Sequence, residues 1–199
     1  MIRLPVLIAT AFLLGCNVLP IQGPVDLYQL PPPQQEPAIT GPRLATMRID
    51  SPITSEALSG NRLLIVTADN RFQAFPGMRL AAPTALLWRD WLLDAYWRDG
   101  RVTGLSAASE GLQSSLELGG ILRAFQVENT DGRPAAVIQY DAILINTADR
   151  RIIASERFDA RHDMASMTVD EAVSAMGVAA NLLVDELIDW TVEQGQAAP

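Results

Sequence analysis

The stretch LELGGILRAFQV, residues 116–127, alternates apolar and polar side chains around the pair Gly119-Gly120. This alternation predicts a β-strand with one buried face, and the glycine pair predicts a bulge within it. The turn sequence Asn129-Thr130-Asp131-Gly132 follows at once. Beyond the turn, apolar side chains occupy every second position from residue 136 to residue 144, which predicts an antiparallel partner strand.

A second turn, a third strand and a long helix complete this half of the chain. Residues 146–150 form the turn, and residues 151–161 are expected to return as a long strand. Thr168 and Glu171 have the spacing of a capping box, so we expect a helix to begin there and to run to about residue 194. Its apolar side chains recur at helical spacing and form the expected buried stripe: Val173, Met176, Ala180, Leu183, Leu187 and Ile188.

Shorter strands precede this meander. Residues 62–67 contain an apolar run without polar alternation, so we expect a buried strand at the centre of the sheet. Residues 71–75 are its expected hairpin partner, and residues 44–49 and 101–105 are further strand candidates. The element order predicts an α+β fold, in which a mixed, mostly antiparallel sheet carries a central helix and a long C-terminal helix mainly on one face.

The central helix has an unusual pattern. It begins at Pro83 or Thr84 and is ended by Gly100. One set of apolar residues has helical spacing and is expected to face the core: Leu87, Trp88, Trp91, Leu92 and Ala95. Leu86, Leu93 and Trp97 recur on the opposite side, so the helix has two apolar faces. The second face either packs under another part of the same domain or contacts a partner.

The beginning of the chain has the pattern of a lipoprotein signal peptide. Arg3 precedes an uncharged apolar run over residues 4–14, which is too short to span a bilayer. Leu13-Leu14-Gly15-Cys16 then matches a lipobox. We therefore predict that residues 1–15 are a signal peptide and that Cys16 carries a diacylglycerol and an N-acyl chain such as palmitate. The alternative is an ordinary signal peptide followed by a free or buried cysteine.

Residues 16–42 are predicted to be the lipidated cysteine and a proline-rich linker. Seven prolines lie between residues 17 and 42, and each one fixes φ and removes a hydrogen-bond donor. A linker of this length that is wholly polyproline-like reaches about 80 Å. Residues 26–30 alternate as a short strand and are a candidate for pairing with the sheet. The remaining residues, 43–195, are expected to form a single domain.

Composition excludes several classes of function. The net charge of −8 argues against a nucleic-acid partner and against a broad anionic lipid surface. Every basic residue is an arginine, which excludes lysine Schiff-base chemistry. The single histidine, His162, lies between Arg161 and Asp163 on a strand end, a poor setting for a metal site or a proton relay. We therefore predict a protein that is not an enzyme, with no metal and no cofactor besides the covalent lipid on Cys16.

The order of these features resembles that of the ABC-type transport auxiliary lipoprotein family. The resemblance is carried by the lipobox, Tyr28-x-Leu30, the run from Asn61 to Val66, the stretch from Arg79 to Pro83, the meander, and the helix from Ala172-Val173 to Trp190. It implies a periplasm-facing lipoprotein that assists the movement of phospholipid or another apolar solute between two membranes. The implied partners are a mammalian-cell-entry-domain protein and ABC transporter subunits. No catalytic residue carries over.

Two functional hypotheses follow, and both place the protein at a membrane. Asn17 stands where many envelope lipoproteins retained at the inner membrane have aspartate, so we predict the outer membrane. In the first hypothesis the domain is a docking module, and Leu86, Leu93 and Trp97 form its partner face. In the second, the domain is itself a lipid-binding carrier, because the central helix is apolar on both sides over a strongly apolar sheet.

Overall fold

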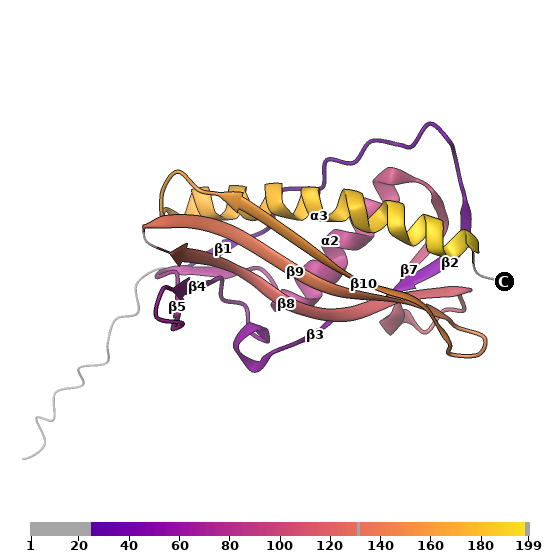
Figure 1. Cartoon of the computed structure of the whole chain (residues 1–199), viewed down its shortest axis with the longest axis horizontal. Helices are drawn as coiled ribbons and strands as arrows, with labels where there is room; N and C mark the ends of the chain where they lie inside the picture. The colour runs from indigo at the N-terminus through magenta and orange to yellow at the C-terminus, as the bar shows by residue number, and fades with distance from the viewer. Residues whose placement is uncertain (1–24, 131, 198–199) are drawn as a thin grey trace, which may run out of the picture.

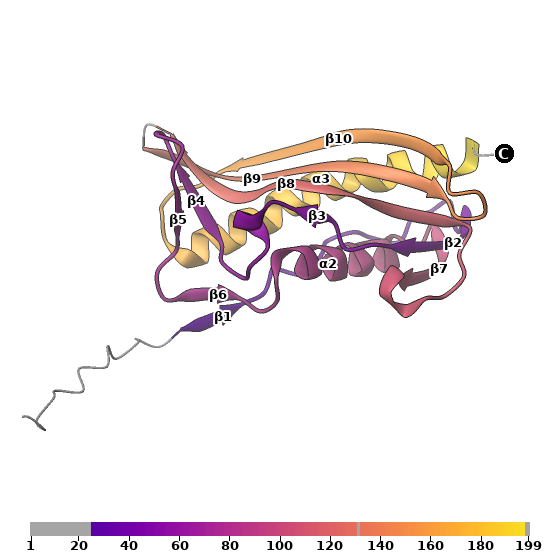
Figure 2. The same cartoon turned by 90° about the horizontal axis from the view of Figure 1, so that it is seen from below.

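The computed structural model describes residues 25–130 and 132–197, and two helices pack on one face of a large curled sheet (Figures 1 and 2). The elements are β1 (Asp26–Tyr28), β2 (Leu44–Ile49), β3 (Ile53–Thr54), β4 (Leu64–Thr67), β5 (Phe72–Ala74), β6 (Met78–Leu80), α2 (Thr84–Asp99), β7 (Val102–Ala107), β8 (Leu116–Thr130), β9 (Arg133–Asn146), β10 (Ile152–Asp163) and α3 (Val169–Ala197). The predicted α+β class, with a mixed sheet, a central helix and a long C-terminal helix, is confirmed.

Strand β8 is the centre of the large sheet, whose order is β10-β9-β8-β2-β7. It pairs antiparallel with β9 along its whole length, and β10 returns antiparallel to β9, so the predicted three-strand meander is confirmed. On its other edge, β2, β3 and β4 pair with it one after another, and all three run parallel to it. One strand therefore joins most of the chain into a single sheet.

The predicted bulge at Gly119-Gly120 is displaced. The register shift in β8 falls between Leu122 and Ala124, while the two glycines stay paired with β9. Gly120 has a φ of 146°, and a Cβ atom built there would lie 2.0 Å from the carbonyl oxygen of Asp141. Glycine is thus required by the close approach of two backbones, which the sequence pattern does not distinguish from a bulge.

The expectation that residues 62–67 lie at the centre of the sheet is wrong. Strand β4 pairs with the far end of β8 and with β5, its confirmed hairpin partner. Leu63 and Leu64 are buried, but Ile65 and Val66 are only half-buried. An uninterrupted apolar run shows that a strand is largely covered, but it does not show which strands it pairs with.

The core lies between the sheet and the two helices, with Trp88 of α2 at its middle. The Trp88 ring stands edge-on to Phe125 and Tyr140, with centroid separations of 6.2 and 6.1 Å. Helix α2 is joined to α3 by a buried hydrogen bond of 2.7 Å between the hydroxyl groups of Tyr96 and Thr191. The predicted inner stripe of α2 is buried throughout, as is that of α3 except Val173, which is half-buried. Both helices therefore have fixed positions on the sheet.

Residues 25–38 pack on the domain and are not a free linker. Strand β1 pairs parallel with β6, and the side chain of Leu30 is buried. The indole nitrogen of Trp91 donates to the carbonyl oxygen of Pro31 at 2.8 Å, and the side-chain oxygen of Asn181 accepts from the amide of Gln34 at 2.8 Å. The domain boundary predicted at residue 43 therefore moves to residue 25 in the described structure. Prolines remove donors, but they keep their carbonyl groups and rings, and both helices bind these.

The outer face of the sheet carries ion pairs in place of a second layer of helices. The carboxylate of Asp141 accepts from Arg157 at 2.6 Å and from Arg123 at 2.8 Å. Hydrogen bonding to Arg157, supported by Arg123, lowers the pKa of Asp141 to about 2. Glu117, which is nearly buried, is held in the same way between Arg48 and Arg150. The arginines thus neutralise the acidic side chains on this face.

Gly177 of α3 provides a test of the packed N-terminal segment. A Cβ atom at this position would lie 2.7 Å from Cγ of Pro31 and 2.9 Å from its Cδ. We expect Gly177→Ala to lower the free energy of unfolding by about 1–2 kcal/mol net, because the overlap outweighs the helix propensity gained. Urea unfolding measures this change. Gly60→Ala is the control, since no atom lies within 4 Å of its Cβ, and Pro31→Ala should restore much of the loss in the double variant.

Asp141 provides a test of the ion pairs on the outer face. Its folded-state pKa of about 2 lies below the ordinary value of 3.8, so its contribution is complete above pH ~4 and is lost as pH falls toward ~2. Asp141→Asn should lower stability at pH 7 by about 1 kcal/mol or less, and the gap to the unsubstituted protein should close toward pH ~2. Chemical denaturation across this range measures it. A stability difference that stays constant with pH would contradict the lowered pKa of Asp141. Asp149→Asn, in an exposed turn, is the matched control.

Candidate functional site

Neither a metal-type cluster of side chains nor a membrane-spanning helix marks a site within the described residues. Across residues 25–130 and 132–197, no cluster of histidine, cysteine and carboxylate side chains has the arrangement of a metal site. Within the same residues, no helix combines the length and the apolar character needed to cross a bilayer. Cys16, the predicted lipid-attachment residue, lies outside the described part of the chain. The candidate site is a surface of helix α2 and the groove beside it.

Helix α2 presents an apolar ridge to solvent. Trp97 is 59% exposed and Leu86 is 38% exposed, while Leu93 between them is half-buried against the core. Asp90 lies on the same side of the helix at helical spacing. We call Leu86, Asp90, Leu93 and Trp97 the α2 ridge. The described residues thus cover Leu93 and part of Leu86, and of the second apolar face predicted from the sequence Trp97 is the most exposed side chain.

The position of the ridge is fixed by the buried side of the same helix. The rings of Trp88 and Trp91 stack with a centroid separation of 5.7 Å, and both are buried. The hydroxyl of Thr84 donates to the carbonyl oxygen of Gly60 at the first turn, and Gly100 ends the helix with a φ of 75°. Since both ends and the inner face are held, the exposed side chains stand on a rigid support.

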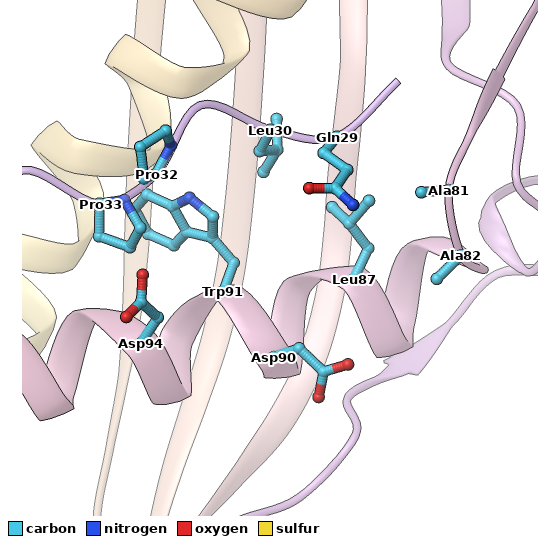
Figure 3. A pocket seen from close by; sticks show the side chains of 10 residues that line it. All are labelled: Gln29, Leu30, Pro32, Pro33, Ala81, Ala82, Leu87, Asp90, Trp91 and Asp94. Atoms are coloured by element: carbon cyan, nitrogen blue, oxygen red, sulfur yellow. The ribbon is translucent and has the colours of Figure 1, made fainter. Parts of the chain in front are cut away.

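A groove runs beside the ridge, between α2 and the N-terminal segment (Figure 3). Its volume is about 520 Å³. Its lining is mostly apolar and comprises Gln29, Leu30, Pro32, Pro33, Ala81, Ala82, Leu87, Asp90, Trp91 and Asp94. Figure 3 shows the indole of Trp91 beneath the proline pair, where its hydrogen bond to Pro31 holds the ring. The groove is thus a formed feature with an aromatic floor.

The acidic side chains at the edge of the groove are already paired. Asp94 accepts from Arg98 at 3.0 Å, one helical turn away, and Asp90 accepts from Arg89 at 2.6 Å. Between these paired carboxylates the lining of the groove is mostly apolar. The ridge and the groove can therefore bind apolar side chains of a partner.

The sequence located the ridge but missed the groove. Leu86, Leu93 and Trp97 were recognised by their helical spacing, and the structure brings them to one side of α2. The groove depends on the proline run of residues 31–33, a run that the sequence predicts to be part of a linker. The alternating residues 26–30 directly before that run were the available signal that the segment is ordered.

Comparison with known proteins shows the fold. A scan against protein-family models and a search of curated proteins each found no match. Among solved structures, the chain is similar to a Xanthomonas campestris protein of the DUF330 family, with 21% identity, 86% of this chain and 98% of that chain covered, and a TM-score of 0.78.

Two further solved structures have the same fold with lower similarity. An uncharacterized protein has 20% identity, covers 86% of this chain and 99% of its own, and has a TM-score of 0.62. A Chlamydia trachomatis protein has 9% identity, covers 78% of this chain and 99% of its own, and has a TM-score of 0.53. The fold thus occurs as a complete unit in other chains, and at these identities the similarity shows fold alone.

Substituting two tryptophans of α2 tests whether one face of the helix belongs to the surface and the other to the core. We expect Trp97→Ala to change the free energy of unfolding by no more than about 0.5 kcal/mol, because the side chain is mostly exposed. Trp91→Ala should cost about 3–5 kcal/mol, because it removes a buried ring and the hydrogen bond to Pro31. Urea unfolding of both variants measures the difference. A large loss for Trp97→Ala would show that this face is core.

Proposed function

We propose that this protein is a lipid-anchored lipoprotein of the bacterial envelope whose domain docks on a membrane transport complex through the α2 ridge. The observation that carries the proposal is Trp97, 59% exposed on a helix that is rigidly held on its other side. The ridge supplies the contact, and the lipobox at Leu13-Leu14-Gly15-Cys16 supplies the anchor.

The anchor follows from the chemistry of lipidation. Each buried methylene of an acyl chain contributes about 0.8 kcal/mol, so two or three chains on Cys16 hold the protein in its membrane for its lifetime. Asn17 after the cysteine favours the outer membrane over the inner one, with the domain facing the periplasm. In this proposal the lipid is a covalent modification and serves no catalytic step.

The ridge has the character of a docking surface. Tryptophan is the residue most enriched at the energetic centres of protein interfaces, and rigid support lowers the entropy lost on binding. Leu86 and Trp97 are eleven residues apart on one side of α2, about 16 Å along its axis, and the groove beside them accepts a further apolar group. This geometry suits a helix or an extended segment of a partner.

The partner we propose is a mammalian-cell-entry-domain protein together with ABC transporter subunits. This part of the proposal comes from the resemblance of the sequence to transport auxiliary lipoproteins, and the apolar ridge is compatible with it. The protein would act as an auxiliary component that couples such a system to the membrane holding Cys16. It is proposed to have no enzymatic activity.

The carrier hypothesis has less support from the geometry. A carrier needs apolar space for acyl chains, and the space between α2 and the sheet is filled by Trp88, Phe125 and Tyr140. The groove of about 520 Å³ is lined on one side by a proline segment that is hydrogen-bonded in place. Mass spectrometry of the purified protein tests this alternative, which requires phospholipid to copurify with the domain.

Affinity purification of the full-length protein from native membranes in mild detergent tests the docking role. We expect transporter subunits to copurify with the unsubstituted protein and to be lost with Trp97→Arg, because a charge replaces the most exposed apolar side chain of the ridge. Ile152→Arg is the matched control, since Ile152 is equally exposed, at 58%, on β10. Equal recovery with Trp97→Arg would reject the ridge as the contact, and recovery of the unsubstituted protein alone would reject the transport role.

A further inference from the structure

We infer that the end of the domain formed by β1 and the β4–β5 hairpin rests on the surface of the membrane that holds Cys16, with Leu27 and Phe72 in contact with lipid. The inference rests on the proposed lipidation of Cys16. It concerns a surface that the docking role leaves unused, because neither residue belongs to the α2 ridge or to the groove.

The chain between the predicted lipid and the domain is short. Cys16 and Val25, the first described residue, are nine residues apart. An extended chain covers at most about 3.5 Å per residue, so Val25 lies within about 30 Å of the lipidated cysteine. Helix α3, with 29 residues, is about 44 Å long. The domain is therefore longer than its tether, and the end that carries Val25 is the end held near the bilayer.

That end exposes apolar side chains. Figures 1 and 2 both place β1 and the β4–β5 hairpin at the same end of the molecule. Leu27 is 71% exposed on β1, and Phe72 is 55% exposed on β5. Ile152 is exposed where β10 begins, at the end of the molecule opposite to β1. The tether therefore distinguishes two ends that are otherwise similarly apolar.

The local charge of the hairpin suits contact with a membrane. The tip of the hairpin carries Asp69 and Arg71, which form an ion pair, so the tip has no net charge. The net charge of the whole protein is −8. Because the tip itself is neutral, anionic headgroups do not repel it. Two apolar side chains alone bind a bilayer weakly, but a short tether raises their effective concentration at its surface.

The contact also orients the docking surface. Helix α2 begins near β6 and runs toward β7, away from the end that carries β1 (Figure 2). Leu86 lies in the first turn of α2 and Trp97 lies in its last turn. The ridge therefore runs away from the bilayer, and Trp97 lies at its far end. A domain resting on β1 and the hairpin thus presents Trp97 to the periplasm, where a partner from the other membrane arrives.

Site-specific labelling tests the contact in the full-length lipidated protein. Cys16 is the only cysteine of the sequence, and in the lipidated protein its sulfur carries the diacylglycerol, so one introduced cysteine is the only free thiol. Leu27→Cys and Phe72→Cys are labelled with an environment-sensitive fluorophore, and Ile152→Cys is the control. Each protein is reconstituted in vesicles of phosphatidylethanolamine and phosphatidylglycerol that contain doxyl-labelled lipid. We expect a blue shift and a loss of fluorescence at positions 27 and 72 and neither change at position 152.

Flotation of the same vesicles distinguishes a failure of the membrane contact from a failure of the lipid anchor. Protein that floats with the vesicles while labels at positions 27 and 72 behave like the label at position 152 would overturn the membrane contact and leave the anchor intact. Protein that does not float would overturn the anchor and the contact with it. Because Leu27 and Phe72 are mostly exposed, the substitutions leave the core unchanged, and a thermal midpoint equal to that of the unsubstituted protein verifies folding.

Discussion

The burial of Trp88 between α2 and the sheet is the contact on which the remaining structure depends. Its ring meets Phe125 of β8 and Tyr140 of β9, the two strands that carry most of the sheet pairing. One side chain thus ties the central helix to the central hairpin. Because the inner face of α2 is fixed in this way, its outer face cannot turn inward, and Trp97 stays in solvent.

The neighbouring tryptophan of α2 attaches the N-terminal segment to the helices. Trp91 stacks on Trp88 and donates its indole N–H to the carbonyl oxygen of Pro31, which brings the proline segment onto the helices. Gly177 of α3 leaves the room that the Pro31 ring needs. The segment that would have been a long tether therefore becomes part of the domain. The free length between the predicted lipid and the fold falls from about 80 Å to about 30 Å, which changes where the domain sits relative to its membrane.

Regular periodicity was enough to predict the meander and both helices, because each of these elements buries one face at a spacing of 2 or 3.6 residues. The α2 ridge was found by the same rule, since a second stripe at helical spacing is visible without any tertiary information. The errors concern contacts between distant residues. Trp91 and Pro31 are 60 residues apart, and local sequence gives no reason to join them. Likewise, the run at residues 62–67 does not reveal that it pairs with one end of β8.

The small size of the ridge is compatible with docking because of the anchor. Two exposed apolar side chains and one half-buried neighbour offer little contact area, and free in solution such a surface binds weakly. A tether of about 30 Å holds the domain in a thin layer beside its membrane, so a partner that reaches into this layer meets the domain at an effective concentration of order millimolar. A contact with a Kd in the micromolar range is then occupied most of the time. In the proposed docking role, the anchor thus supplies the local concentration that the small contact area of the ridge requires.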